Sequence, residues 1–148
     1  KVEKVSISPR GLSLGVTITA SNPDEEVILQ TENDIFNELK VLMGGRAAEE
    51  VFCHALTGGA ADDIKRASKL AKDAIQYYGF TGRGPYVPEH ESLIREIEIK
   101  AAEWIKEAYD IAKEEMEKNK DKINELYGDL ILEEELTGER IEKVLNQK

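Results

Sequence analysis

The stretch from Leu42 to Asp63, LMGGRAAEEVFCHALTGGAADD, decides the fold, because it ends one predicted helix and begins the next. Apolar residues recur at helical spacing on both sides of it, which predicts helices over about 33–52 and 62–78 joined by a loop at 53–59. The stretch also contains the carboxylates that have a plausible place in a functional site: Glu49, Glu50, Asp62 and Asp63.

The second of these helices separates its two aspartates by their phase. At about 100° per residue, Asp63 falls in phase with Ala67 and should face inward, whereas Asp62 falls in phase with Lys65 and should face solvent. The helix dipole stabilises a carboxylate in the first turn by about 0.3–1 kcal/mol, which favours the ionised form. Two interpretations of Asp63 follow, a ligand for a cation and a helix N-cap. The apolar face of this helix comprises Ile64, Ala67, Leu70, Ala71, Ala74, Ile75 and Tyr78.

The first helix places charged residues inside its apolar stripe. Arg46 and Glu50 lie four residues apart on the core face, which predicts an internal ion pair, and Glu49 lies on the edge of that face. Gly44 and Gly45 each cost about 1 kcal/mol relative to Ala in a helix, which predicts a close neighbour against this backbone. The core face comprises Ile35, Phe36, Leu39, Leu42, Met43 and Ala47.

Composition limits the class of protein. The chain has 148 residues, 41% of them hydrophobic and 34% charged, as expected of one soluble globular domain spanning 1–148. Its net charge of -10 argues against a nucleic-acid partner. The single cysteine, Cys53, can form no internal disulfide, and we interpret it as a small, partly buried apolar residue in a reducing compartment. We find no apolar run long enough to span a membrane and no signal-peptide pattern, although a longer protein could carry an anchor elsewhere.

The remaining pattern predicts a mainly α (α+β) fold, with a small β-unit over 1–30 and a helical body over 31–148. Alternating residues predict two strands, over about 5–7 and 12–18, with a turn at Pro9 to Gly11, and a short strand over 27–29. Thr31 and Asp34 have the spacing of a capping box, and Gly79 is predicted to end the second helix. Helices follow over about 91–119, with Trp104 in the core, and over 121–132; Thr137 should cap a last short helix. The helix over 121–132 is predicted to bury Ile123, Leu126, Tyr127, Leu130 and Ile131.

Histidine is scarce. His54 and His90 are the only two in the chain, and neither belongs to a His-Glu-x-x-His motif. A weak metal site using His54 and Asp63 is one interpretation of the loop, and a surface histidine is the other.

Several segments, in order, resemble the peptidase domain of FtsH-type ATP-dependent zinc proteases. They are residues 4–11 (KVSISPRG), 14–17 (LGVT), 42–50 (LMGGRAAEE), 57–67 (TGGAADDIKRA), 78–80 (YGF) and 135–141 (ELTGERI). The resemblance covers nearly the whole chain. The fold it implies is a helical, bundle-like peptidase domain.

The resemblance implies a zinc metalloendopeptidase that degrades unfolded or membrane proteins fed to it by a hexameric AAA+ ATPase. It implies that Asp63 is a zinc ligand, that Glu49 orients a ligand histidine, and that the domain lies on the cytoplasmic side of a membrane-anchored protein. Zinc-activated water would attack the peptide carbonyl.

The chain departs from this pattern in ways that matter for activity. In the family a His-Glu-x-x-His helix supplies two zinc ligands and the general base, and it should lie about a dozen residues before Val2. This chain does not contain the motif. We therefore expect the chain by itself to be inactive, with an incomplete zinc site and with ATP bound only by a separate AAA+ module. The alternative is a non-catalytic relative that serves as an assembly or adaptor module through the Trp104 helix and the C-terminal helices.

Overall fold

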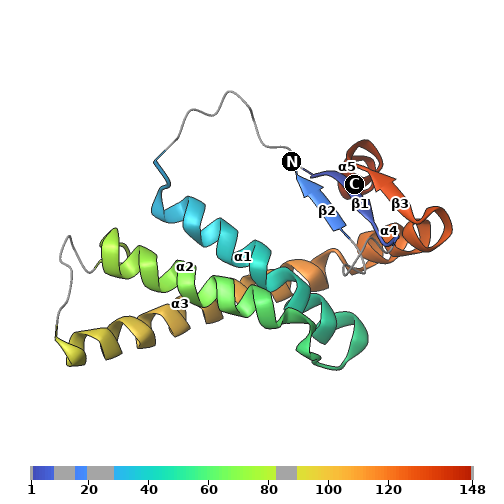
Figure 1. The fold of residues 1–148 in the computed structure, drawn as a ribbon. Helices are drawn as coiled ribbons and strands as arrows, with labels where there is room; N and C mark the ends of the chain where they lie inside the picture. The colour runs from blue at the N-terminus through green and yellow to red at the C-terminus, as the bar shows by residue number, and fades with distance from the viewer. Residues whose placement is uncertain (1, 9–15, 20–28, 83–89, 148) are drawn as a thin grey trace. The chain divides into compact units, whose positions relative to one another are not determined.

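The computed structural model describes residues 2–8, 16–19, 29–82 and 90–147 (Figure 1). The chain divides into two compact units, one formed by residues 29–118 and the other by 1–28 together with 119–148. The turn predicted at Pro9 to Gly11, and most of the strand predicted over 27–29, lie outside the described residues. In the part of the chain that the structure describes, no helix is long and apolar enough to cross a membrane.

The helical unit contains α1 (Glu32–Ala48), α2 (Ala61–Tyr77) and α3 (Glu91–Lys118). The predicted capping box begins α1: the Thr31 side chain accepts the backbone N–H of Asp34, and the Asp34 carboxylate accepts that of Thr31 at 2.9 Å. Gly79 follows α2 with a φ of 70°, the left-handed conformation that glycine adopts without a steric penalty. These three helices and their ends agree with the sequence prediction to within a few residues.

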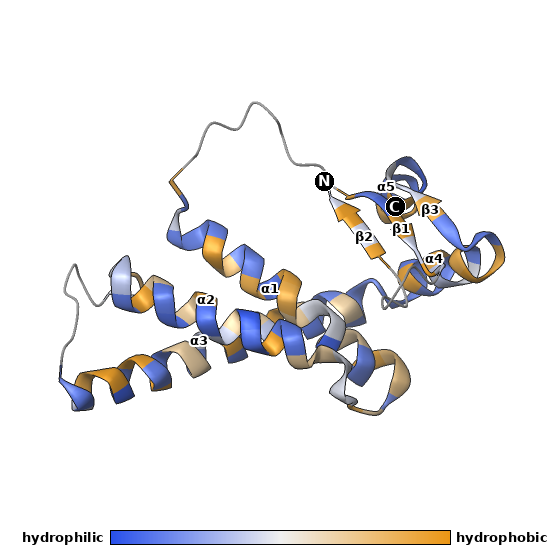
Figure 2. Cartoon of the chain, in the orientation of Figure 1, coloured by the Kyte–Doolittle hydropathy of each residue, from blue (hydrophilic) through white to orange (hydrophobic). Residues whose placement is uncertain are grey.

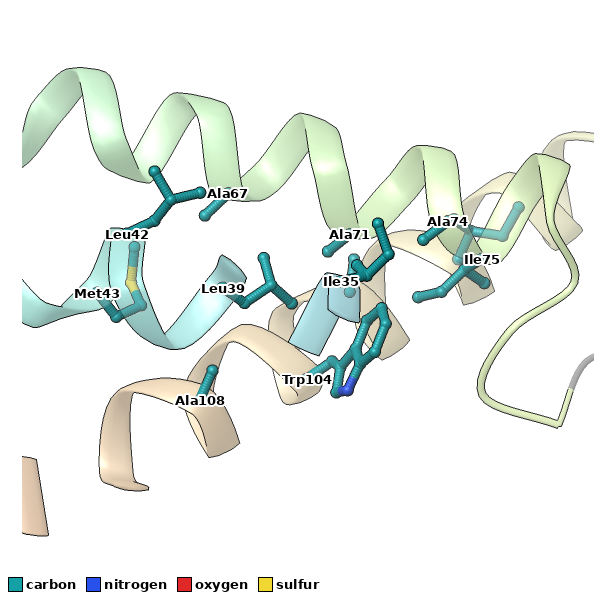
Figure 3. Packing of buried hydrophobic residues seen from close by; sticks show 12 residues of the cluster. Ile35, Leu39, Leu42, Met43, Ala67, Ala71, Ala74, Ile75, Trp104 and Ala108 are labelled. Carbon is teal, nitrogen blue, oxygen red and sulfur yellow. The ribbon is translucent and has the colours of Figure 1, made fainter. Parts of the chain in front are cut away.

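The core of this unit lies where the three helices meet (Figure 3). Hydrophilic and hydrophobic bands alternate along the ribbons of α2 and α3 (Figure 2). The face that α2 buries consists mainly of alanines, and these allow the larger side chains of α1 and α3 to approach its backbone. Trp104 is buried as predicted and stacks on Phe36, with ring centroids 5.8 Å apart and an interplanar angle of 6°. Each large side chain buried here contributes about 1.5–3 kcal/mol to stability.

The other unit is a three-stranded antiparallel sheet with two helices. Its strands are β1 (Val2–Ser6), β2 (Val16–Thr19) and β3 (Glu135–Thr137), in the order β2-β1-β3, and its helices are α4 (Lys120–Glu133) and α5 (Gly138–Leu145). Thr137 caps α5 as predicted, since its side chain accepts the Arg140 N–H at 3.4 Å. The mainly α fold with a small β-unit is therefore confirmed, whereas the sequence pattern did not reveal the third strand.

The burial predicted for α4 is wrong. None of its residues is buried, and Tyr127 and Ile131 are 63% and 54% exposed. Three other apolar residues of α4, Ile123, Leu126 and Leu130, are half-buried and line an apolar hollow of about 310 Å³ with Val5 and Leu136. The reason is geometric: the three short strands of this unit are too small to cover the whole apolar stripe of a 14-residue helix.

The glycine pair in α1 gives a mixed result. A Cβ on Gly44 would lie 3.8 Å from the Met116 methyl group, an ordinary contact, and nothing among the described residues approaches the Gly45 position within 4 Å. The predicted neighbour is therefore found at Gly44, in Met116, and is absent at Gly45 within the described residues.

Substitution of Gly138 tests the packing of α5 against β1. A Cβ at this buried position would lie 2.2 Å from the Val2 carbonyl oxygen, so the backbone of β1 would have to move. We expect Gly138→Ala to lower the free energy of unfolding by about 1–3 kcal/mol, measured by urea unfolding followed by circular dichroism.

Gly128→Ala is the matched control for this substitution. Nothing lies within 4 Å of a Cβ at Gly128, which is inside α4, so alanine there should raise stability by up to about 1 kcal/mol. Equal unfolding midpoints for the two variants would contradict this packing of Gly138 against β1.

Candidate functional site

The end of α1 widens into a π-helical turn, η1 (Glu49–Cys53). Residues in such a turn bond i to i+5, and π turns are frequent at functional sites. The turn ends at His54, which is exposed and has a φ of 50°. Glu49 and Glu50 therefore leave the regular 3.6-residue phase of α1 at the point where the sequence predicted a continuous helix.

The Glu49 carboxylate binds the loop that precedes α2. One oxygen, Oε1, accepts the Thr57 hydroxyl, and the other, Oε2, accepts the Thr57 N–H at 3.3 Å. Arg46 Nη1 lies 3.4 Å from Oε2 and donates to the Thr57 carbonyl at 2.8 Å. Glu49, Arg46 and Thr57 thus form one polar junction between the end of α1 and the start of α2.

This junction favours the ionised form of Glu49. The hydrogen bonds from the Thr57 side chain and backbone, with a smaller effect of Arg46, hold the pKa of Glu49 below its ordinary value. Glu49 is accordingly a carboxylate that accepts hydrogen bonds at neutral pH.

The predicted ion pair between Arg46 and Glu50 is wrong. Arg46 pairs with Glu49, and Glu50 accepts hydrogen bonds from Tyr109 and Lys113 of α3. The bond with Glu50 raises the pKa of Lys113. The physical reason for the difference is the π turn, because i and i+4 positions no longer share a face where the helix widens.

Thr57 also caps the short turn that precedes α2. Its hydroxyl oxygen accepts the Gly59 N–H at 3.0 Å and so caps a short 3₁₀ turn, η2 (Gly58–Ala60), that continues into α2. A Cβ on Gly59 would lie 3.2 Å from Thr57 Oγ1 and 3.5 Å from Glu49 Oε1. Glycine therefore allows the close approach of this backbone to the Thr57 hydroxyl.

Asp63 lies in the first turn of α2, as predicted. Its side chain is 44% exposed, so the inward orientation predicted from its phase is met only in part, whereas Asp62 is exposed as predicted. The Asp63 carboxylate is 3.7 Å from Arg66. The Arg66 side chain is itself 67% exposed, so this pair contributes little to stability. The residue at the N-cap position of α2 is Ala60, and the cap bond of the preceding turn comes from Thr57. Asp63 is thus not the N-cap, and Arg66 is its one charged partner within the described residues.

Cys53 is the last residue of the π turn, and His54 follows it. Cys53 is exposed, which contradicts the partly buried position we predicted, because the π turn ends here in an open loop. Within the described residues no group of three His, Cys, Asp or Glu side chains could hold a metal ion. Asp63 is an accessible oxygen donor of the kind that zinc accepts as a ligand.

Comparison with known proteins adds to this geometry. Residues 1–92 match the model of peptidase family M41. The ATP-dependent zinc metalloprotease FtsH of Slackia heliotrinireducens is 33% identical to the chain, over 98% of the chain and 21% of its own length. The proteins of the same name from Helicobacter felis and Caldicellulosiruptor bescii are 30% and 33% identical, over 99% and 97% of the chain and 26% of their own lengths. The chain spans about a fifth to a quarter of the curated relatives it matches.

The lowered pKa of Glu49 predicts how its contribution depends on pH. A carboxyl whose pKa is lower in the folded state stabilises the fold above its unfolded pKa, about 4.3, and this stabilisation is lost as pH falls through the folded value. We expect Glu49→Gln to lower the urea midpoint at pH 7, and the difference from wild type to shrink as the pH falls below 4.

Glu103→Gln is the control for this experiment, because Glu103 is exposed on α3. Its difference from wild type should be small and should not follow the pH profile of Glu49→Gln. A Glu49→Gln difference that stays constant from pH 7 to pH 3 would contradict the assigned hydrogen bonds.

Proposed function

The chain belongs to peptidase family M41, and we propose that it forms part of the zinc metalloendopeptidase domain of an ATP-dependent protease, with Asp63 as a zinc ligand. The observation that carries the proposal is the position of Asp63 in the first turn of α2. Its carboxylate is accessible and is not used as a helix cap, because Thr57 supplies the cap bond of the preceding turn. A carboxylate in the first turn of a helix lies near the positive end of the helix dipole.

Asp63 would hold the metal together with ligands that the described residues do not supply. The family resemblance attributes those ligands to a His-Glu-x-x-His helix. Bound zinc supplies a Lewis acid that activates water and polarises a peptide carbonyl. The role of this chain in that chemistry is to fix the position of one carboxylate ligand at the start of a rigid helix.

Glu49 is proposed to orient a histidine ligand. A carboxylate has about four lone-pair positions. Glu49 receives the Thr57 hydroxyl, the Thr57 N–H and Arg46, which leaves room for one more donor such as an imidazole N–H. Such a bond would fix the tautomer and ring orientation of the histidine.

The relatives' names support a wider proposal about the whole protein. We propose that it couples ATP hydrolysis in an AAA+ module to the degradation of unfolded or membrane proteins. By resemblance it would be anchored to a membrane with this domain on the cytoplasmic side. The present 148 residues contain no His-Glu-x-x-His motif, so by themselves we expect them to be inactive.

Asp63→Asn in the full-length protein tests the proposal directly. The substitution keeps the size of the side chain but removes the charge, so we expect zinc content to fall from about one per chain to near zero. Hydrolysis of an unfolded substrate such as casein should fall at least about 100-fold, because loss of a ligand should cost more than loss of an outer partner.

Asp62→Asn is the matched control, since Asp62 is the adjacent but exposed aspartate of the same turn. It should keep wild-type zinc content and activity, and the 148-residue chain alone should hydrolyse nothing. Full zinc binding and activity in Asp63→Asn would remove Asp63 from the mechanism.

A non-catalytic assembly module is the alternative function, and one observation favours a role in assembly. Tyr127, Ile131 and Leu132 of α4 are 63%, 54% and 84% exposed, which is typical of a surface that meets another protein. Both functions imply a homo-oligomer, and the family resemblance implies that this oligomer is a hexamer.

Leu132→Asp tests this surface. We expect it to reduce the mass of the full-length assembly in light scattering, whereas Leu29→Asp, at a position 87% exposed in the helical unit, should leave the mass unchanged. An assembly that lacks zinc and peptidase activity but keeps its mass would favour the alternative. A strictly monomeric protein would contradict it.

A further inference from the structure

Thr57 uses all three of its polar groups at the junction between α1 and α2. Its hydroxyl donates to Glu49 and accepts the Gly59 N–H, its N–H donates to Glu49, and its carbonyl accepts from Arg46. We propose that Thr57 is a positioning residue for the metal site, which sets where the first turn of α2 begins and so where the Asp63 carboxylate lies. This inference rests on the proposed function for the identity of the metal.

The loop before α2 is exposed along its length. Residues 53–59 are all exposed, and the structure assigns no helix or strand to residues 54–57. Ala60 is the first buried residue after this loop, at 7% exposure, and α2 begins at the next residue, Ala61, without a side-chain cap. The contacts of Thr57 therefore fix the approach of the chain to α2 from the N-terminal side.

The two glycines after Thr57 make this contact more important. Glycine restricts the backbone less than any other residue, so Gly58 and Gly59 do not fix the direction of the chain by themselves. The Gly59 N–H is held by the Thr57 hydroxyl, which is held in turn by Glu49. The Thr57 hydroxyl thus connects the π turn after α1 to the 3₁₀ turn that leads to Asp63.

A group that orients a metal ligand from outside the coordination shell typically changes metal affinity by 10–100-fold. Thr57 does not contact Asp63 in this structure; it acts through the intervening turn. Loss of its hydroxyl should leave α2 folded, because the alanine face of α2 stays buried against α1 and α3. The first turn of α2 would then be less restricted, and the metal would bind less tightly.

Thr31 provides a control of the same chemistry in the same unit. Its hydroxyl also donates to a carboxylate, that of Asp34 at 2.6 Å, and also accepts a backbone N–H, at 3.2 Å. It caps the opposite end of α1, away from the junction with α2. Thr57→Val and Thr31→Val therefore remove equivalent hydrogen bonds, and they differ in whether the turn that the threonine caps leads directly to Asp63.

The experiment measures zinc affinity by chelator competition in the full-length protein. We expect Thr57→Val to raise the zinc dissociation constant by about 10–100-fold, and Thr57→Ser, which keeps the hydroxyl, to restore it to within about threefold of wild type. Thr31→Val should also stay within about threefold. In the metal-free protein, amide hydrogen exchange from Gly59 to Asp63 should accelerate in Thr57→Val and not in Thr31→Val.

The outcomes separate this inference from the proposed function. If Asp63→Asn abolishes zinc binding while Thr57→Val leaves it unchanged, Thr57 has no positioning role and the proposed function stands. If Asp63→Asn leaves zinc binding unchanged, the proposed ligand is wrong. In that case amide hydrogen exchange still tests whether Thr57 fixes the first turn of α2. Equal exchange rates from Gly59 to Asp63 in Thr57→Val and Thr31→Val would show that it does not.

Discussion

The hydrogen bonds between the Glu49 carboxylate and Thr57 join the end of α1 to the start of α2, and the geometry of the candidate site depends on them. Arg46 strengthens the junction, since it contacts both the carboxylate and the Thr57 carbonyl. Hydrophobic packing is not directional and can hold two helices together without fixing where either begins. Directional hydrogen bonds to a charged carboxylate can fix where a helix begins, and they are stronger than hydrogen bonds between neutral groups.

The helical core holds the three helices together, whereas the polar junction fixes the loop between α1 and α2. Alanines on α2 and larger residues such as Leu39 and Trp104 on its partners bring the three helices close together. Glu50 adds a second polar link, from the π turn to Tyr109 and Lys113 of α3. The π turn thus directs one glutamate toward the loop before α2 and the next toward α3. Glu49 restrains the loop that leads to Asp63, and Glu50 holds the π turn itself against α3.

Helical periodicity was sufficient to predict much of this arrangement. The three helices, the Thr31 cap, the burial of Trp104 and the order of exposure of Asp62 and Asp63 all follow from local spacing. These features depend on residues within one turn of each other, so the sequence alone carries them. Membership of family M41 is likewise visible from the motifs in the chain.

The features that could not be predicted depend on contacts distant in sequence or on departures from regular helix geometry. Because of the π turn, Arg46 pairs with Glu49 and not with Glu50, and Cys53 is exposed. No local sequence pattern predicts such a turn. β3 has three residues and pairs with β1 more than 120 residues earlier in the chain, so it carries too few residues to show an alternating pattern. The partial burial of α4 depends on the size of the sheet that covers it. That size cannot be predicted from the sequence of the helix alone.

We propose that Asp63 is a zinc ligand beside a junction built on Glu49. The most direct measurement is a zinc-bound crystal structure of the full-length protein, with the metal identified by its anomalous scattering. The account predicts an Asp63 carboxylate oxygen at about 2.0–2.2 Å from zinc, with Thr57 hydrogen-bonded to Glu49 at the base of α2. A zinc ion whose ligands exclude Asp63 would contradict it.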